Sequence, residues 1–195
     1  MTADASVVLD GEAMRRTLVR IAHELVEKNP LGAGESPSVA LVGIHRRGAI
    51  LARRLNALTS ELLDSEVPLG ELDIAFYRDD LGMRPSAPVV HSTQLDFPLD
   101  ARTVVIVDAV LYTGRTVRAG IDAIFDYGRP ARIQLAVMVD RGHRELPIRP
   151  DYVGKNLPTS RQQRVNVRVA ELDGVDEITV GPAAERLEAV GGGRL

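Results

Sequence analysis

The chain contains no cysteine among its 195 residues. Disulfide bonds, thiolate metal sites and cysteine nucleophiles are therefore excluded. No apolar run approaches the length of a membrane span, and the N-terminal residues MTADASVV lack the basic-then-apolar order of a signal peptide. The formal net charge of -3 offers no overall attraction for nucleic acid or membranes, so such binding would need a local basic patch. We expect a cytoplasmic protein with no membrane partner.

Apolar residues make up 45% of the chain, which is ample for a buried core, and charged residues make up 26%. No internal repeat divides the sequence. Length and composition together predict a single domain over residues 1–195, with residues 1–6 and 190–195 as disordered tails.

Strand and helix patterns alternate along the chain. Asp10 is a candidate N-cap for a helix over residues 11–28, and further helices are expected over 49–63 and 113–127. Buried strands are predicted over 38–44, 70–77, 103–108 and 132–140, with a loop over 78–88 and its returning arm over 89–97. Short strands and loops fill 141–180. The alternation predicts an α/β fold, a mostly parallel sheet flanked by helices, with a small C-terminal hood-like segment.

A phosphate-binding turn is predicted where the strand over 103–108 leads into the third helix. A helix N-terminus offers unpaired N–H groups and the positive end of its dipole. Gly114 lets the backbone approach a phosphate closely, and Thr113 and Thr116 add hydroxyl donors. Asp108 stands at the carboxyl end of the strand, where open α/β sheets bind ligands. The residues TGRT alone are as consistent with a helix cap, but the whole stretch VVIVDAVLYTGRT favours a ligand site.

This stretch resembles the binding motif for 5-phosphoribosyl diphosphate (PRPP) in the type I phosphoribosyltransferases. The motif comprises Val104, Val105, Ile106, Val107, Asp108, Ala109, Val110, Leu111, Tyr112, Thr113, Gly114, Arg115 and Thr116. Other segments, including LVGIHRRG, LDIAFYRDDL and RGHRELPIRPDYVGKNLPTSR, resemble the pyrimidine-operon regulators of this family. Those regulators bind pyrimidine leader mRNA and convert uracil and PRPP to UMP and diphosphate. The resemblance implies the type I phosphoribosyltransferase fold and both functions for this chain.

The resemblance also implies roles for the matched residues. The ribose hydroxyls would contact Asp108. The 5-phosphate would be held by Thr113, Gly114, Arg115 and Thr116. The diphosphate would lie near Arg47, Gly48 and Arg78, and the uracil pocket would be formed by Val153, Gly154 and Lys155. Mg²⁺ would accompany PRPP with few protein ligands, and no residue is assigned to it. Taken as residues alone, Arg47 and Arg78 are better explained by a solvated turn and an exposed charged loop.

Three positions bear on activity. Ala109 stands where the family has a second acid, so one ribose hydroxyl loses a charged acceptor. Because a charge-assisted hydrogen bond is worth about 1.5–3 kcal/mol, the loss would reach roughly 10- to 100-fold in rate if the bond were made fully in the transition state. Arg46 replaces a usual threonine in the diphosphate loop. Tyr112 stands where purine-using relatives carry an acid, which favours a pyrimidine.

RNA contacts are implied by the resemblance for a set of basic residues. These are Arg20, His23, His143, Arg144, Arg149 and Lys155. They would bind pyr leader mRNA in response to UMP or UTP, by attenuation or translational control. As residues alone, Arg16, Arg20 and His23 fit an exposed helix face beside Glu24 and Glu27. The family also implies a homodimer or homotetramer.

Two functions stay open at this point. One is an RNA-binding regulator with uracil phosphoribosyltransferase activity. The other is a nucleotide-sensing RNA-binding regulator with little or no catalysis, which Ala109 makes credible. A phosphoribosyltransferase for another base is disfavoured by the C-terminal third of the chain.

Overall fold

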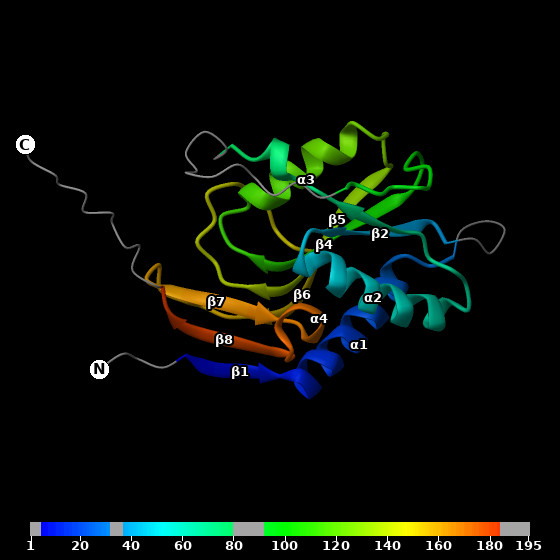
Figure 1. Ribbon diagram of the computed structural model, residues 1–195. Coiled ribbons are helices and arrows are strands. Elements are labelled where there is room, and N and C mark those ends of the chain that lie inside the picture. The colour runs from blue at the N-terminus through cyan, green and yellow to red at the C-terminus, as the bar shows by residue number, and fades with distance from the viewer. Residues whose placement is uncertain (1–4, 32–36, 80–91, 184–195) are drawn as a thin grey trace, which may run out of the picture.

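The computed structural model describes residues 5–31, 37–79 and 92–183, and its centre is a five-stranded sheet (Figure 1). The strand order is β3-β2-β4-β5-β6, and every neighbouring pair is parallel. The strands are β2 (Val39–Ile44), β3 (Leu69–Leu72), β4 (Thr103–Leu111), β5 (Arg132–Asp140) and β6 (Tyr152–Asn156). The predicted α/β class is confirmed.

Helices cover both faces of this sheet. On one face, α1 (Gly11–Lys28) and α2 (Arg47–Leu63) pack in a core cluster with Val105 and Val107 of β4. On the other, α3 (Arg115–Phe125) packs with Val104 and Ile106. Burial on both faces explains why β2 and β4 are nearly continuous apolar runs. No helix within the described ranges is long and apolar enough to cross a membrane.

Local side-chain contacts and sequence patterns set the ends of several helices and strands. The predicted bounds of α1 and β5 are confirmed, and the Asp10 carboxylate caps α1 by accepting the N–H of Ala13 at 2.8 Å. The strand predicted over 70–77 is wrong beyond Leu72, because the chain there forms a 3₁₀ helix, η1 (Ala75–Tyr77). The Asp73 carboxylate accepts the N–H of Ala75 at 2.7 Å, and such a local bond turns the chain out of the extended form.

A second sheet forms the hood. It is antiparallel, in the order β1-β8-β7, and consists of β1 (Ser6–Asp10), β7 (Gln163–Arg168) and β8 (Glu177–Pro182), with the short helix α4 (Ala170–Asp173) between β7 and β8. Figure 1 shows β1 beside β8 at the edge of the molecule. The hood is therefore built from both ends of the chain, and Ser6, predicted to lie in a tail, is paired with Val180. Residues 1–4 and 190–195, and most of the loop predicted over 78–88, lie outside the described residues.

Candidate active site

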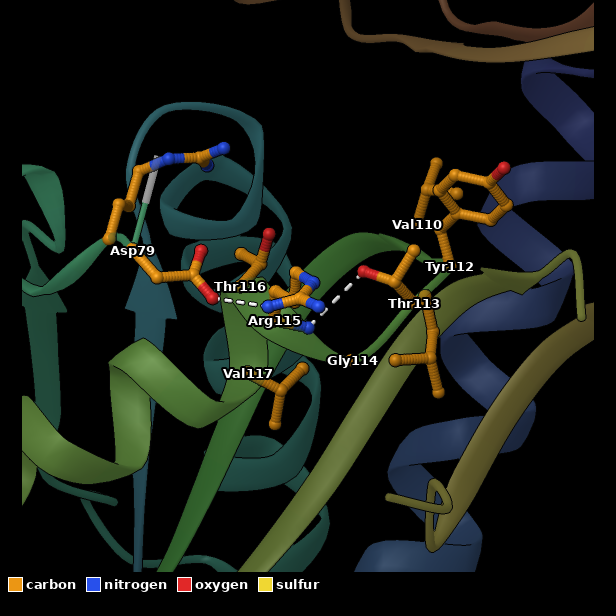
Figure 2. Close-up of a pocket in the computed structure, with 10 residues that line it drawn as sticks. Asp79, Val110, Tyr112, Thr113, Gly114, Arg115, Thr116 and Val117 are labelled. Atoms are coloured by element: carbon orange, nitrogen blue, oxygen red, sulfur yellow. Dashed lines mark hydrogen bonds and ion pairs between the residues drawn. The ribbon is translucent and has the colours of Figure 1, made fainter. Parts of the chain in front are cut away.

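The parallel strands bring their carboxyl ends to one edge of the central sheet, where a pocket of about 210 Å³ opens (Figure 2). It is lined by Arg78 and Asp79, which follow η1, and by residues 110–117, which run from the end of β4 into α3. The structure thus places the predicted phosphate ligands and Arg78 around a single cavity.

The phosphate turn owes its shape to Gly114. This residue has φ +94°, a left-handed conformation that side-chain-bearing residues rarely adopt, and it immediately precedes α3. The carbonyl of Thr113 accepts the N–H groups of Glu145 and Leu146 at 3.0 and 3.1 Å. The turn is therefore held from the segment after β5 and presents the N-terminus of α3 to the pocket.

The side chain of Arg115 is committed to neighbouring acids. Its guanidinium pairs with Asp79 and, at 2.8 Å, with Glu145. Figure 2 shows Arg115 extended toward Asp79 across the pocket. A phosphate in this turn would meet the backbone N–H of Arg115 with the side-chain charge already shared between two carboxylates.

Asp108 lies near the end of β4 with a perturbed carboxyl group. Burial raises its pKa to about 6, although the N–H of Ala109, donated to its carboxylate at 2.7 Å, and the positive charge of Arg78 both act to lower it. The influence of Arg78 shows that the predicted ribose and diphosphate residues lie within electrostatic reach of each other. A carboxyl group whose pKa is raised by burial in this way is typical of a functional site.

Ala109 faces the side of the central sheet that α1 and α2 cover. Its side chain is 8% exposed and packs in the core cluster beneath α1 and α2, with Val107 and Met138. An acid at this position would have to leave water for a mainly apolar surrounding, which is costly for a charged group.

The loop predicted to face the diphosphate meets β4 through Gly48. A Cβ on Gly48 would lie 2.5 Å from the carbonyl oxygen of Val107 and 3.2 Å from the Cα of Asp108, so only glycine allows this approach. The start of α2 is therefore next to Asp108. The Arg47 guanidinium instead extends to the hood, where its Nε and Nη2 donate to Asp173 at 3.2 and 2.6 Å. The structure gives this side chain a partner that the sequence did not predict.

The residues predicted for the uracil pocket lie on β6, the edge strand. Val153 packs with the core cluster that holds Leu111, and Lys155 lies opposite Val139 of β5. Arg20 of α1 donates to the carbonyls of Val153 and Gly154, both at 2.8 Å. This contact fixes the backbone of β6 and gives Arg20 a structural role beyond the predicted RNA contact.

Arg144, another RNA candidate, holds the backbone that leads into the phosphate turn. Its guanidinium donates to the carbonyls of Tyr112 and Ile148, each at 2.9 Å, and pairs with Asp140. The neighbouring Arg141, which sequence reasoning missed, is 8% exposed and stacks over the ring of Tyr112 at 4.2 Å. Nothing in the local sequence pattern distinguishes the buried Arg141 and the half-buried Arg144 from surface arginines.

The remaining RNA candidates are more accessible. His23 and Arg149 are exposed, whereas His143 is half-buried, with its ring nitrogen bonded to the carbonyl of Thr159. His143 also contacts the Tyr112 ring edge-on, at 5.9 Å between centroids. Within this set Arg20, His23 and Arg149 are the exposed side chains, and Arg20 is the one of the three that is bonded to β6.

Comparison with known proteins agrees with this geometry. Residues 4–172 match the family model of the phosphoribosyl transferase domain. The hypoxanthine phosphoribosyltransferase of Trypanosoma cruzi superposes with a TM-score of 0.67 over 91% of this chain and 97% of that chain, at 18% identity. A hypoxanthine phosphoribosyltransferase from Staphylococcus aureus gives 0.65 over 92% and 93%, at 17% identity. The family match and the fold thus define a protein of the phosphoribosyltransferase class.

Sequence relatives narrow the assignment. The bifunctional protein PyrR of Roseiflexus sp. (strain RS-1) is 60% identical over 86% of this chain and 89% of its own length. The bifunctional PyrR proteins of Deinococcus deserti and Acetivibrio thermocellus are 54% and 52% identical, each over 91% of this chain and over 95% and 94% of their own lengths. The chain belongs to the PyrR family of phosphoribosyltransferases.

Proposed function

We propose that this protein regulates pyrimidine-biosynthesis genes by binding pyr leader mRNA in response to UMP or UTP, and that it converts uracil and PRPP to UMP and diphosphate. The observation that carries the catalytic half is the turn at the start of α3, which lines the pocket together with Arg78. The name of the relatives, bifunctional protein PyrR, supports the pairing of two functions. We propose that the protein acts in the cytoplasm, where such mRNA is made.

The residues of the site suit a reaction that depends on positioning. The first turn of α3 holds the 5-phosphate, the Asp108 carboxylate accepts hydrogen bonds from ribose hydroxyls, and Arg78 attracts the diphosphate. The bond from ribose C1 to diphosphate breaks and its electron pair leaves with the diphosphate. N1 of uracil bonds to C1, and its proton passes to the diphosphate or to solvent. Fixed charges and dipoles stabilise the positive charge that develops on the sugar.

Base selection would depend on the backbone of β6. Fixed N–H and C=O groups can pair with the edge of a pyrimidine without any titratable side chain. The contact of Arg20 with the carbonyls of Val153 and Gly154 keeps this strand in place.

Mg²⁺ is proposed to enter with PRPP, whose diphosphate charge it neutralises when bound. Mg²⁺ prefers oxygen ligands and retains several waters. The carboxylate of Asp108 is a donor of this kind at the ribose end of the site, and PRPP and water would supply the other ligands. Within residues 5–31, 37–79 and 92–183, no group of three or more His, Asp or Glu side chains is arranged to hold a metal.

The second candidate function is nucleotide sensing with little catalysis. It is raised by the missing second acid at Ala109, whose side chain packs in the core cluster of α1 and α2. We expect UMP to form from uracil and PRPP with Mg²⁺ in a chromatographic assay, and UMP to bind in parallel calorimetry. Turnover supports the enzyme. UMP binding without turnover, with turnover appearing in Ala109→Asp, would identify a regulator that lost its second acid. If the protein neither binds UMP nor forms it, that result contradicts the proposal.

Substitution of Arg149 tests the proposed RNA binding. Replacing it by alanine should weaken binding of a pyrimidine-operon leader transcript about tenfold, because one exposed phosphate-contacting cation is lost. The slope of log affinity against log salt should fall by about one. Filter binding over a salt series, with UMP present, measures both quantities. Arg164→Ala, an exposed arginine of β7 outside the predicted surface, is the control, and an equal loss there would refute a localised RNA surface.

The family also implies a homodimer or homotetramer, and we propose this assembly here. Light scattering of the purified protein over a concentration series would show the mass of the particle.

A further inference from the structure

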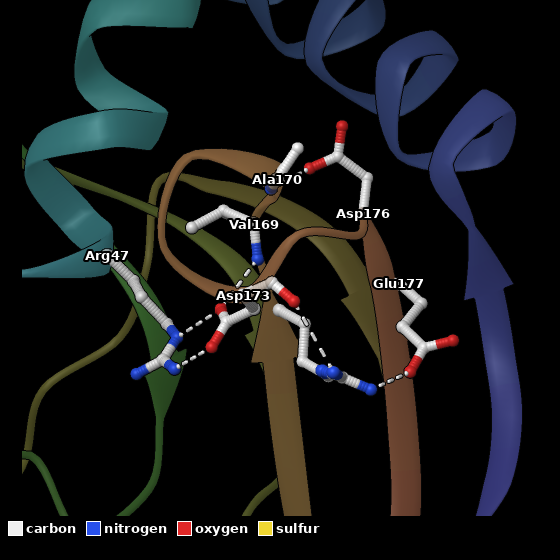
Figure 3. A network of polar contacts seen from close by, with 7 residues as sticks. Arg47, Val169, Ala170, Asp173, Asp176 and Glu177 are labelled. Carbon is white, nitrogen blue, oxygen red and sulfur yellow. Dashed lines mark hydrogen bonds and ion pairs between the residues drawn. The ribbon is translucent and has the colours of Figure 1, made fainter.

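Acidic side chains of the hood pair with two arginines of α2, Arg47 and Arg54. The hood loop, residues 169–176 between β7 and β8, carries these acids (Figure 3). Arg54 contacts Glu171 at 2.5 Å and Asp176 at 2.8 Å, and Arg47 contacts Asp173 through two nitrogens. The hood is therefore joined to α2 at two points, one in its first turn and one about two turns further along.

Asp173 is fixed within its own loop. Its Oδ2 accepts the backbone N–H of Val169 at 2.9 Å, in addition to the bond from Arg47. Its side chain is 16% exposed, and the hydrogen bond from Arg47 is the main reason its pKa lies below the ordinary value. A charged carboxylate held from its own backbone is a firm anchor for a planar guanidinium, which binds carboxylates in two-bonded form.

Arg47 connects Asp173 to the candidate active site. It is the first residue of α2 and precedes Gly48, whose Cα sits against the end of β4 beside Asp108. Figure 3 shows the Arg47 side chain leaving the first turn of α2 and meeting Asp173 in the hood loop. One ion pair therefore ties the hood to the loop predicted to face the diphosphate.

We propose that Asp173 is a positioning residue for the diphosphate end of PRPP, because by holding Arg47 it fixes the backbone of residues 45–48 beside Asp108. This inference rests on the proposed function. The diphosphate then meets the backbone of this loop, and the Arg47 side chain serves as the tether. Glu171 holds Arg54 in the same manner but further from the loop, so it has no such effect.

The test compares Asp173→Asn with Glu171→Gln. Both changes turn an acid that binds an α2 arginine into an amide of the same size, and the asparagine keeps an oxygen for the N–H of Val169. For Asp173→Asn, calorimetry should show PRPP with Mg²⁺ bound about tenfold more weakly, because small misplacements of a positioning group are costly. UMP, which has no diphosphate, should bind within twofold of the unsubstituted protein. Glu171→Gln should leave both affinities within twofold.

Two further measurements separate positioning from general damage. The KM for PRPP should rise by the same factor in Asp173→Asn while the KM for uracil stays unchanged. Arg47→Ala should reproduce the effect, and the double variant should be no worse than either single one, because both act through one contact.

Several outcomes would overturn the inference. Unchanged PRPP binding in Asp173→Asn would show that the ion pair between Arg47 and Asp173 does not affect PRPP affinity. Tighter binding would show that Asp173 keeps the Arg47 side chain away from the ligand. Equal weakening of PRPP and UMP would indicate a general structural defect. A failure of the proposed function looks different, because the unsubstituted protein would then bind neither ligand.

Discussion

Replacing Asp108 by asparagine is expected to reduce UMP formation by about 100-fold or more while making the folded protein more stable at neutral pH. The amide loses the charge with which the carboxylate accepts hydrogen bonds from ribose hydroxyls. Each such bond is worth about 1.5–3 kcal/mol, so losing the charged part of two of them accounts for this factor. The stability gain follows because burial disfavours the ionised carboxylate, whose pKa is raised to about 6.

The pH dependence of both effects has a defined sign. The folded protein holds the proton of Asp108 more tightly than the unfolded chain, where the pKa is near the ordinary value of 3.8. The resulting stabilisation is fully present below about pH 4 and is lost as the pH rises through about 6. The asparagine variant should therefore exceed the unsubstituted protein in stability above pH 6 and lose that advantage near pH 4. Turnover of the unsubstituted protein should rise through about pH 6 as the carboxylate ionises.

Urea unfolding at pH 4, 6 and 8, together with UMP formation at pH 6 to 8, measures these changes. Asp122→Asn provides the control, because Asp122 is an exposed acid on α3 that pairs with Arg118 outside the pocket. We expect it to alter stability by less than about 0.5 kcal/mol and turnover hardly at all. An asparagine variant at position 108 that kept full turnover, or was less stable at pH 8, would contradict the assignment.

Substituting Gly114 by alanine is expected to weaken binding of both UMP and PRPP by about 10- to 100-fold. Space is sufficient, since a Cβ would lie 3.4 Å from the side chains of Leu146 and Ile148, which is an ordinary contact. The backbone angle is the obstacle, because φ +94° strains any residue with a Cβ by about 1–2 kcal/mol. Relief of that strain would rotate the N–H groups at the start of α3 away from the 5-phosphate that both ligands carry.

Gly174→Ala is the matched control for UMP binding. Gly174 has φ +73°, and a Cβ there would meet nothing within 4 Å, so the backbone strain is similar but lies in the hood loop. Both variants should lose about 1–2 kcal/mol of unfolding free energy in urea, and only Gly114→Ala should lose UMP affinity. Equal affinity losses in the two variants would show that general destabilisation, and not the turn, is responsible.

Local sequence pattern determined much of the fold and the core of the site. A buried strand shows as an apolar run, an amphipathic helix as a stripe, and a helix start as a capping residue such as Asp10. The turn at the start of α3 could be predicted because Thr113, Gly114 and Thr116 are consecutive or nearly so, and its chemistry depends on the start of a single helix. That the turn binds a phosphate stays a prediction. The parallel sheet then follows from strand–helix alternation, since crossover connections leave few other arrangements.

The tertiary structure alone decided which distant residues meet. Arg47 and Asp173 are 126 positions apart, Arg20 and Val153 are 133 apart, and Ser6 pairs with Val180 across 174. The pattern around each of these arginines fits a solvated surface equally well, because a guanidinium finds its partner through packing of whole elements. Ala109 shows the same limit, since its neighbours in the core come from helices far away in sequence. Periodicity records which face of an element is buried, whereas the identity of the group opposite it depends on long-range docking that no local pattern encodes.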